Sequence, residues 1–292
     1  MSMNLPSTAH NTPGDHDHRP SRYLLADLPY WAMIILLFGA FLVYNFITDE
    51  TYSQIFSTLV EGVMVTIQVT LISYFFALFL GLTTALMQLS ENFLLRNIAQ
   101  LYVQIVRGVP ILVQIFYWAF VIFPIILDGL HALGASLATA GILQSENWMV
   151  LLDAKEVGFL PRGIAALAFS YGAFSSEIFR AGIQSIEKGQ REAASALGLT
   201  WFQSLRFIVL PQAFRRVLPP LGNDFIAMLK ETSLVSAIGV GEITQEGKKY
   251  AAASFLFPET YNTVAFLYLS MTLVLSTAVR YMERRLKTDQ KK

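Results

Sequence analysis

Charged residues interrupt two of the most apolar stretches of this 292-residue sequence. The uncharged run 163–176 ends at Glu177, and Arg180 follows one helical turn later. A charge at the centre of a membrane helix costs about 2.5–3.5 kcal/mol on insertion scales, so such side chains should face protein or water rather than lipid. Glu177 can therefore form an i,i+3 ion pair with Arg180 near the membrane surface, or it can line a path for a polar solute.

The stretch 212–241 holds a second group of such residues, made of two prolines, an Asn-Asp pair and a Lys-Glu pair. In chain order they are Pro219, Pro220, Asn223, Asp224, Lys230 and Glu231. Proline leaves backbone carbonyls unpaired, and at membrane depth these are tolerated only beside protein or a water-filled cavity. We predict a cavity-facing helix here; the alternative is a helix buried against its neighbour with internally paired charges. Arg107, in the run Arg-Gly-Val-Pro, indicates another kinked polar segment whose role can be purely architectural.

The composition indicates that these residues belong to a membrane protein. Hydrophobic residues make up 54% of the chain and charged residues only 14%, whereas soluble domains carry roughly 25% charged residues. A net charge of zero offers no field for nucleic acid, and the absence of cysteine excludes disulfides and thiol catalysis. No G-x-x-x-x-G-K-[ST] run is present. We therefore predict no metal site, no cofactor and no enzymatic activity in this chain.

A transmembrane helix needs about 20 apolar residues, and six segments approach that demand. Four are free of charge and lie between Asp27 and Asp49, Glu61 and Glu91, Arg107 and Asp128, and Glu259 and Arg280. With the two interrupted stretches they predict an all-α, polytopic membrane protein with about six transmembrane helices. Residues 129–161 are short of apolar length, so we interpret them as an extracytoplasmic helical insertion rather than a re-entrant or seventh span.

The basic residues predict the orientation of these spans. If the N-terminus lies inside, fifteen of the 21 Lys and Arg residues fall on the cytoplasmic side, four fall outside and two fall within spans. This asymmetry is typical of cytoplasmic loops, so both termini are predicted to be cytoplasmic. Residues 1–27 are polar and predict a disordered cytoplasmic tail. A weak metal site formed by His10, His16 and His18 is the less favoured interpretation. The first apolar run lacks a cleavage site and is predicted to be retained.

One segment between spans is amphipathic and too short to cross a bilayer: EAASALGLTWFQSLRFIVLP, residues 192–211. Residues 186–197 are good helix formers, and Gly198 supplies the residue that commonly ends a helix. Thr200 and Gln203 form a capping box that begins a second helix. Its apolar face is predicted to comprise Trp201, Phe202, Leu205 and Ile208, and Pro211 either closes the segment or begins the next span.

This helix–Gly–helix elbow has two interpretations. The side chains from Glu192 to Ala196 are small or polar, which permits close approach of another backbone, and Glu192 can fix its orientation. A protein-docking elbow is therefore favoured. A linker resting on lipid head groups would be expected to carry more lysine and larger apolar side chains on its first helix.

The same segment resembles the EAA loop of ATP-binding-cassette (ABC) importer permeases. The matching positions are Glu192, Ala193, Ala194, Gly198, Ile208, Leu210 and Pro211. Other stretches, including EGVMVTIQVT (61–70), RGVPILVQIFY (107–117) and LPQAFRRVLPPLGNDFIAMLKETSL (210–234), are similar to the polar amino-acid branch, which includes histidine, glutamine, glutamate and arginine permeases. The resemblance covers about residues 55–285.

The resemblance implies a domain organisation. A type I importer permease has a five-helix core, which would occupy residues 55–285, with the coupling loop at 186–211. The present chain departs from the shortest members by an extra N-terminal helix (28–54) and the insertion 128–160. Residues 286–292 would form a basic cytoplasmic tail.

The resemblance also implies a function: passage of a polar amino acid across the bacterial inner membrane by alternating access. The implied partners are ABC ATPase subunits, an extracytoplasmic substrate-binding protein, a second copy or a sister permease, and membrane lipid. ATPase coupling would fall to Glu192, Ala193, Ala194, Gly198, Leu199, Leu210 and Pro211. The substrate path would involve Glu177, Asn223, Asp224, Lys230, Glu231 and Arg107.

Two alternatives remain open at this point. A stand-alone, ion-coupled secondary carrier would also place charges in broken helices, but it has no use for the elbow. A membrane anchor without transport activity fits poorly with charges inside two spans. Neither the transported amino acid nor the choice between a homodimer and a heterodimer follows from the sequence.

Overall fold

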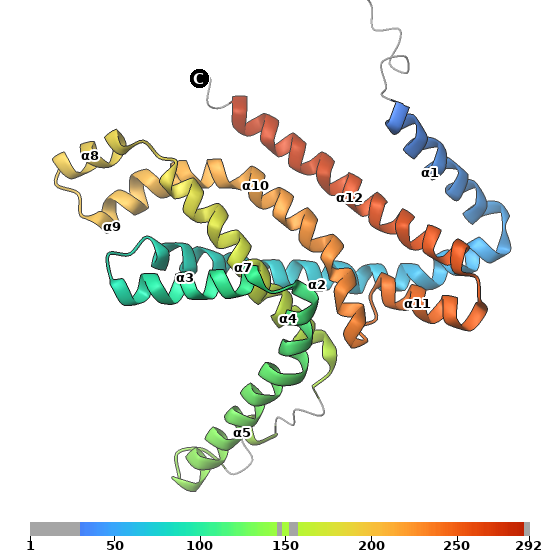
Figure 1. Ribbon diagram of the computed structural model, residues 1–292, viewed down its shortest axis with the longest axis horizontal. Coiled ribbons are helices and arrows are strands. Elements are labelled where there is room, and N and C mark those ends of the chain that lie inside the picture. Colours follow the sequence, from blue (N-terminus) through green and yellow to red (C-terminus); the bar gives the residue numbers. More distant parts are fainter. Residues whose placement is uncertain (1–29, 145–147, 152–156, 289–292) are drawn as a thin grey trace, which may run out of the picture. The chain divides into compact units, whose positions relative to one another are not determined.

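A computed structural model describes residues 30–144, 148–151 and 157–288, and every regular element in these ranges is a helix (Figure 1). The prediction of an all-α protein is confirmed. The chain divides into two compact units, residues 1–44 and 45–292. The predicted tail, 1–27, with its three histidines, lies outside the described residues.

Helix α1 (Tyr30–Thr48) contains most of what is described of the first unit. Its described side chains from Tyr30 to Tyr44 are apolar, and Ile34, Leu37 and Phe41 are more than half exposed. A helix that is hydrophobic on all sides is typical of one surrounded by lipid.

The long helix α2 (Glu50–Gln88) and α7 (Phe159–Gln184) form the central pair of the second unit. Asp49 caps α2 by accepting a hydrogen bond from the amide of Tyr52 at 3.1 Å. The second span was predicted to begin after Glu61. Helix α2 instead begins earlier, at Glu50, and carries Glu61 as an exposed residue. Close packing depends on small residues, since a Cβ at Gly81 would lie 2.9 Å from the Cβ of Ser175 on α7.

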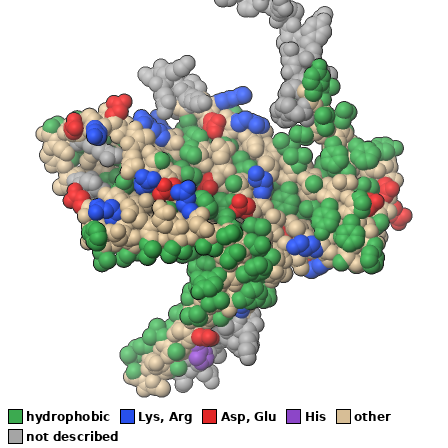
Figure 2. Space-filling model, in the orientation of Figure 1, with side chains coloured by type: hydrophobic (Ala, Val, Ile, Leu, Met, Phe, Trp, Pro, Cys, Tyr) green, Lys and Arg blue, Asp and Glu red, His purple; other side chains and the backbone are tan. Residues whose placement is uncertain are grey.

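The predicted start of the third span, after Arg107, agrees with the structure, in which the apolar stretch Ile111–Thr139 begins at that place. Helix α3 (Phe93–Gly108) already packs against α2 and α7, and α4 (Ile111–Tyr117) begins after a break at Val109–Pro110. Leu94, Leu101 and Ile105 are more than half exposed, and Figure 2 shows hydrophobic side chains along this edge. Helix α3 is therefore an additional helix that the span prediction did not include, and Arg107 lies beside the break that the Arg-Gly-Val-Pro run indicated.

The third span extends beyond its predicted end at Asp128. A π-helix, η1 (Trp118–Ile122), runs directly into α5 (Phe123–Thr139), and the next described element is the short α6 (Trp148–Leu151). Pro124 lacks an amide hydrogen, so the wider turn of η1 accommodates the missing hydrogen bond. Part of the predicted insertion, residues 145–147 and 152–156, lies outside the described residues.

The second half of the chain repeats this combination of π-helix and proline. After α8 (Lys188–Ala196) and α9 (Trp201–Ser204), η2 (Leu205–Val209) precedes Pro211 in α10 (Leu210–Glu231). Then come η3 (Thr232–Ile238), α11 (Ile243–Ser254) and α12 (Phe257–Thr288). Figure 1 places α8 and α9 near one end of the α2–α7 pair and α11 near the other.

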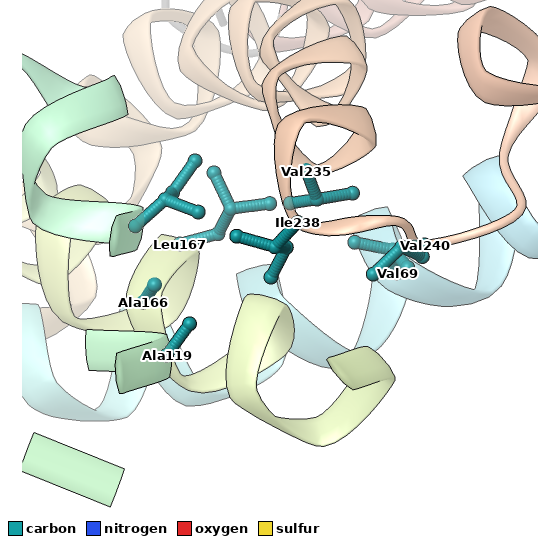
Figure 3. Close-up of a cluster of buried hydrophobic side chains, with 8 residues drawn as sticks. Val69, Ala119, Ala166, Leu167, Val235, Ile238 and Val240 are labelled. Carbon is teal, nitrogen blue, oxygen red and sulfur yellow. The ribbon is translucent and has the colours of Figure 1, made fainter. Parts of the chain in front are cut away.

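A cluster of buried side chains joins five of these elements, α2, α4, η1, α7 and η3 (Figure 3). Val69 of α2 and Leu167 of α7 meet Ala119 of η1 and Val235 of η3, all of them fully buried. In a bilayer this contact gains van der Waals packing rather than removal from water, because lipid is as apolar as leucine. The cluster holds the ends of α7 and η3 against α2.

Three described helical stretches are long and apolar enough to cross a membrane: Glu50–Gln88, Ile111–Thr139 and Phe257–Leu286. Helices α7 and α10 are more polar, as the interrupted sequence stretches predicted. Pro219 and Pro220 lie inside α10 without ending it. These two polar helices position the charged residues considered next.

Candidate functional site: a helical elbow and a charged pocket

The elbow forms as predicted. Helix α8 ends at Ala196, and Gly198 has a φ of +77°, a left-handed conformation in which side chains with a Cβ are strained. The amides of Gly198 and Leu199 donate to the carbonyls of Ser195 (3.0 Å) and Ala194 (3.1 Å). These two bonds make a Schellman motif, which fixes the direction in which the chain leaves α8.

The second arm of the elbow is also capped as predicted. The amide of Thr200 donates to Oε1 of Gln203 at 2.9 Å, and the amide of Gln203 donates to Oγ1 of Thr200 at 3.3 Å. Pro211 does not close the segment but lies in the first turn of α10, so the elbow continues as a helix into the next span. The second arm of the elbow is thereby joined to α10 without a break.

Burial divides the elbow into an inner and an outer face. Ala194 is fully buried, where α8 packs against η2 and α9, while Glu192 and Ala193 are exposed. Leu199 and Leu210 are half-buried, and Pro211 is exposed. The small Ala194 thus serves the internal packing of the elbow, and Glu192 and Ala193 are available to another molecule.

The predicted apolar face of the second arm is only partly correct. Leu205 is buried and Ile208 is half-buried, but Phe202 is 62% exposed; the side chain of Trp201 lies outside the described set. The π-helix η2 changes the helical period, so Phe202 and Phe207, which is 64% exposed, point outward instead. With Leu197, 79% exposed, they give the outer face large apolar side chains.

The structure brings together two predicted path residues on different helices, Arg107 and Glu177. The carboxylate of Glu177 accepts from Nη2 (2.7 Å) and Nε (3.2 Å) of Arg180, and Nη1 of Arg107 lies 3.7 Å away. The interpretation of Glu177 as an i,i+3 ion pair is therefore correct. The three side chains remain partly exposed, at 25% for Glu177, 34% for Arg180 and 48% for Arg107.

This ion-pair cluster borders a polar pocket of about 450 Å³. Figure 2 shows acidic and basic side chains gathered on the part of the surface where α3 and α7 lie in Figure 1. Val103 and four glutamines complete the lining: Gln88, Gln100, Gln104 and Gln184. Such a pocket offers both hydrogen-bond donors and acceptors, together with charges of both signs, to a polar solute.

The predicted polar residues of α10 lie on two faces of that helix. Asp224 is half-buried, and its Oδ2 accepts a hydrogen bond from Oγ of Ser175 on α7 at 2.8 Å. Glu231, seven residues later, is also half-buried and interacts with Tyr171. Asn223 and Lys230 have the same spacing but are exposed. The structure therefore does not bring all four residues together.

Sequence reasoning missed several polar residues that hold this region. Tyr74 of α2 donates to the carbonyl of Leu221 at 2.6 Å, and Ser175 holds Asp224. At the far end of α2, the fully buried Glu242 caps α11 and accepts from the hydroxyl of Tyr268. Burial raises the pKa of the Glu242 carboxyl. Single hydroxyls in apolar helices carry no sequence signal of their own, because the partner is defined only by packing.

The polar stripe on α3 did carry a signal. Arg96, Gln100, Gln104 and Arg107 follow one another at intervals of four, four and three residues, which places them on one face of a helix. Three of them line the pocket. A search for helical periodicity ahead of Arg107 would have predicted both α3 and its polar face.

Comparison with known proteins gives the same architecture. The 77–288 segment matches the family described as "Binding-protein-dependent transport system inner membrane component". The chain is 32% identical over 229 residues to "Glutamine transport system permease protein GlnP" of Escherichia coli (strain K12), which covers 78% of this chain and 93% of that protein. It is 35% identical over 240 residues to "Probable amino-acid permease protein YxeN" of Bacillus subtilis (strain 168), covering 82% and 96%.

Among solved structures, a chain of "an amino acid ABC transporter with histidines" superposes with a TM-score of 0.65 at 30% identity, covering 82% of this chain and 98% of that one. The family match spans most of the described second unit, including α7, the elbow and α10. The chain belongs to the family of inner-membrane components of binding-protein-dependent transport systems, the permeases of ABC importers.

Proposed function

We propose that this chain is the permease subunit of an ABC importer and moves a polar amino acid inward by alternating access. Relatives that cover most of the chain are named as permeases for glutamine, cystine and arginine. We further propose that both termini are cytoplasmic and that the core begins near residue 55, after an extra N-terminal helix.

The observation that carries the proposal is the outer face of the elbow. Leu197, Phe202 and Phe207 are exposed beside the small and acidic residues Ala193 and Glu192. Isolated exposed apolar residues are common, but a group on a rigid, doubly capped turn is typical of a surface completed by another protein. We assign this face to a separate ATPase subunit, with α10 transmitting the movement.

We assign the substrate path to the pocket beside Glu177 and to the exposed face of α10. Lys230 cannot face lipid without a large cost, so it and Asn223 should face water or a second permease subunit. A zwitterionic amino acid has an ammonium that needs an acceptor and a carboxylate that needs a donor. Glu177 can supply the first, and Arg107 or Arg180 the second.

Proteoliposomes distinguish this function from an ion-coupled carrier. The permease is reconstituted with its co-purifying ATPase subunits and binding protein, and uptake of a mixture of radiolabelled amino acids is measured. We expect uptake to require ATP and to persist when an ionophore collapses the ion gradients. Uptake by the permease alone that disappears with the ionophore would favour the carrier. Titration of the binding protein with the twenty amino acids then identifies the substrate.

A further inference from the structure

A second, larger hollow lies between α2, α7, α10 and α12, and the proposed transport function does not use it. It is a groove of about 970 Å³, and its surface is almost entirely apolar. Several of its aromatic side chains, Phe75, Phe79 and Phe214, are more than half exposed. An apolar groove of this size on a membrane protein needs an occupant.

The two ends of the groove differ. At one end Tyr74 and Phe225 pack with ring centroids 5.1 Å apart, and Tyr74 is fixed by its bond to Leu221. At the other end lie Arg206 and Arg215, the only charged residues among those that line the groove within the described ranges. The groove therefore has an apolar, aromatic end and a basic end.

The apolar part has the length of one bilayer leaflet. Arg215 and Phe225 are ten residues apart on α10, which corresponds to about 15 Å at 1.5 Å per residue. Half of a hydrocarbon core roughly 30 Å thick is the same distance. A lipid with its head group beside Arg215 would place its acyl chains along Leu218 and Leu82 toward Phe225.

The basic end is not neutralised by the protein. Neither Arg206 nor Arg215 takes part in an ion pair among the described residues, whereas Arg216 donates to the carbonyl of Ser185. Basic pockets between membrane helices bind anionic lipid head groups. A second copy docked symmetrically in this groove would present the same patch, whose described lining holds no acidic residue, so it could not neutralise these arginines.

We infer that the groove binds an anionic phospholipid, with the phosphate between Arg206 and Arg215 and the acyl chains along the apolar walls. This inference is independent of the transport function. Because η2 and α10 carry both arginines, the lipid would contact the elbow and the span that follows it at the same time.

Native mass spectrometry of the assembled transporter tests the inference. The protein is released from nanodiscs containing equal amounts of phosphatidylglycerol and phosphatidylcholine, and the lipid adducts retained by the permease are counted. Each basic residue near a membrane surface favours an anionic lipid by about fivefold. We therefore expect phosphatidylglycerol to be retained at least about tenfold more than phosphatidylcholine, and the variant R206Q/R215Q to lose that preference.

Two further variants distinguish lipid binding in the groove from nonspecific attraction of anionic lipid to basic residues. R280Q/R285Q removes two arginines of α12 that do not line the groove and should retain the preference. Leu218→Trp fills the apolar part and should lower retention of both lipids. Equal retention of the two lipids by the unaltered protein would overturn the inference, as would equal losses in both double arginine variants.

A protein occupant has its own signature. The chain has no cysteine, so Phe79→Cys introduces a single thiol in the groove. Disulfide-linked permease pairs formed through this thiol in the membrane would show that a second copy fills the groove and would overturn the lipid assignment. Continued absence of such pairs under oxidising conditions supports it.

Discussion

The ion-pair cluster around Glu177 and the elbow are both partly exposed, but the side chains of the cluster contact one another whereas the outer face of the elbow carries large apolar side chains that are more than half exposed. Glu177 is held by Arg180 and Arg107 of its own chain. On the elbow, Leu197 is 79% exposed and Phe202 62% exposed. A site that pairs its own charges can act within one subunit, whereas an outward apolar face requires another molecule. This difference supports the proposed roles, which are solute contact for the first region and coupling for the second.

The largest effect is expected from Gly198→Val in the elbow. At a φ of +77°, a β-branched residue costs about 1–3 kcal/mol of strain, which the chain can relieve by redirecting α9 relative to α8. We expect binding-protein-stimulated ATP hydrolysis in proteoliposomes to fall at least about tenfold. Membrane insertion, measured by the yield of permease in the membrane fraction, should be unchanged.

Gly189→Val provides a matched control for this change. Gly189 and Gly198 both lie in open space, where an added Cβ meets no neighbour, and only Gly198 has a positive φ. The control should retain most of the stimulated hydrolysis. Equal losses in both variants would mean that the surface, not the bend, matters, and normal hydrolysis in both would remove the elbow from the coupling mechanism.

A smaller effect is expected from Glu177→Gln in the charged pocket. The substitution leaves Arg107 and Arg180 without their carboxylate, so the pocket becomes positively charged and loses its negatively charged acceptor for an ammonium. We expect the initial rate of amino-acid uptake to fall about three- to tenfold, since the net contribution of one hydrogen bond in this partly exposed pocket is about 0.5–1.5 kcal/mol. ATPase subunits should still co-purify in normal amounts.

Glu246→Gln tests whether any i,i+3 ion pair has the same influence. Glu246 pairs with Lys249 at 2.8 Å on α11, with the same spacing as Glu177 and Arg180 but outside the pocket. Its uptake rate should stay within about twofold of the unaltered protein, because exposed pairs contribute little. If uptake were the same in both variants, Glu177 would have no role in the path.

The contrast between the two regions also explains what could be predicted from the sequence. Local features of the elbow were predictable because they depend on neighbours in the chain: Gly198 ends α8, and Thr200 and Gln203 cap one another. Long-range pairs were not, because Ser175 and Asp224 are 49 positions apart and meet only through the packing of α7 on α10. The close approach of Arg107 to Glu177 likewise depends on α3.

Helix boundaries were least predictable where the membrane gives no sharp signal. Charged residues were used as ends of spans, but Glu61 and Asp128 both lie inside helices that continue past them. Helix propensity and hydrogen bonding set the ends of α2 and α5, and a helix extending beyond the bilayer can carry charges freely. The π-helices η1 and η2 each end two residues before a proline. This relation can be recognised in the sequence only once the two π-helices are known from the structure.

The smallest effect is expected from Gln203→Ala, which weakens the elbow without straining it. The side chain of Gln203 accepts from the amide of Thr200 at 2.9 Å, and losing one half of a capping box costs about 0.5–1 kcal/mol. Hydrogen exchange at the Thr200 amide should become about two- to fivefold faster. Stimulated ATP hydrolysis should fall by less than about twofold, because the bend at Gly198 and its Schellman bonds remain.

Gln212→Ala is the matched control, since Gln212 donates to the carbonyl of Ile208 and to the side chain of Gln190 on α8 but accepts from no backbone amide of the elbow. It should leave exchange at Thr200 unchanged. If Gln203→Ala abolished stimulated hydrolysis as fully as Gly198→Val, the second arm itself, not the turn, would be the part that the partner holds. If it left exchange at Thr200 unaltered, the capping box would not form in the membrane, and the direction of α9 would have to be set by the partner alone.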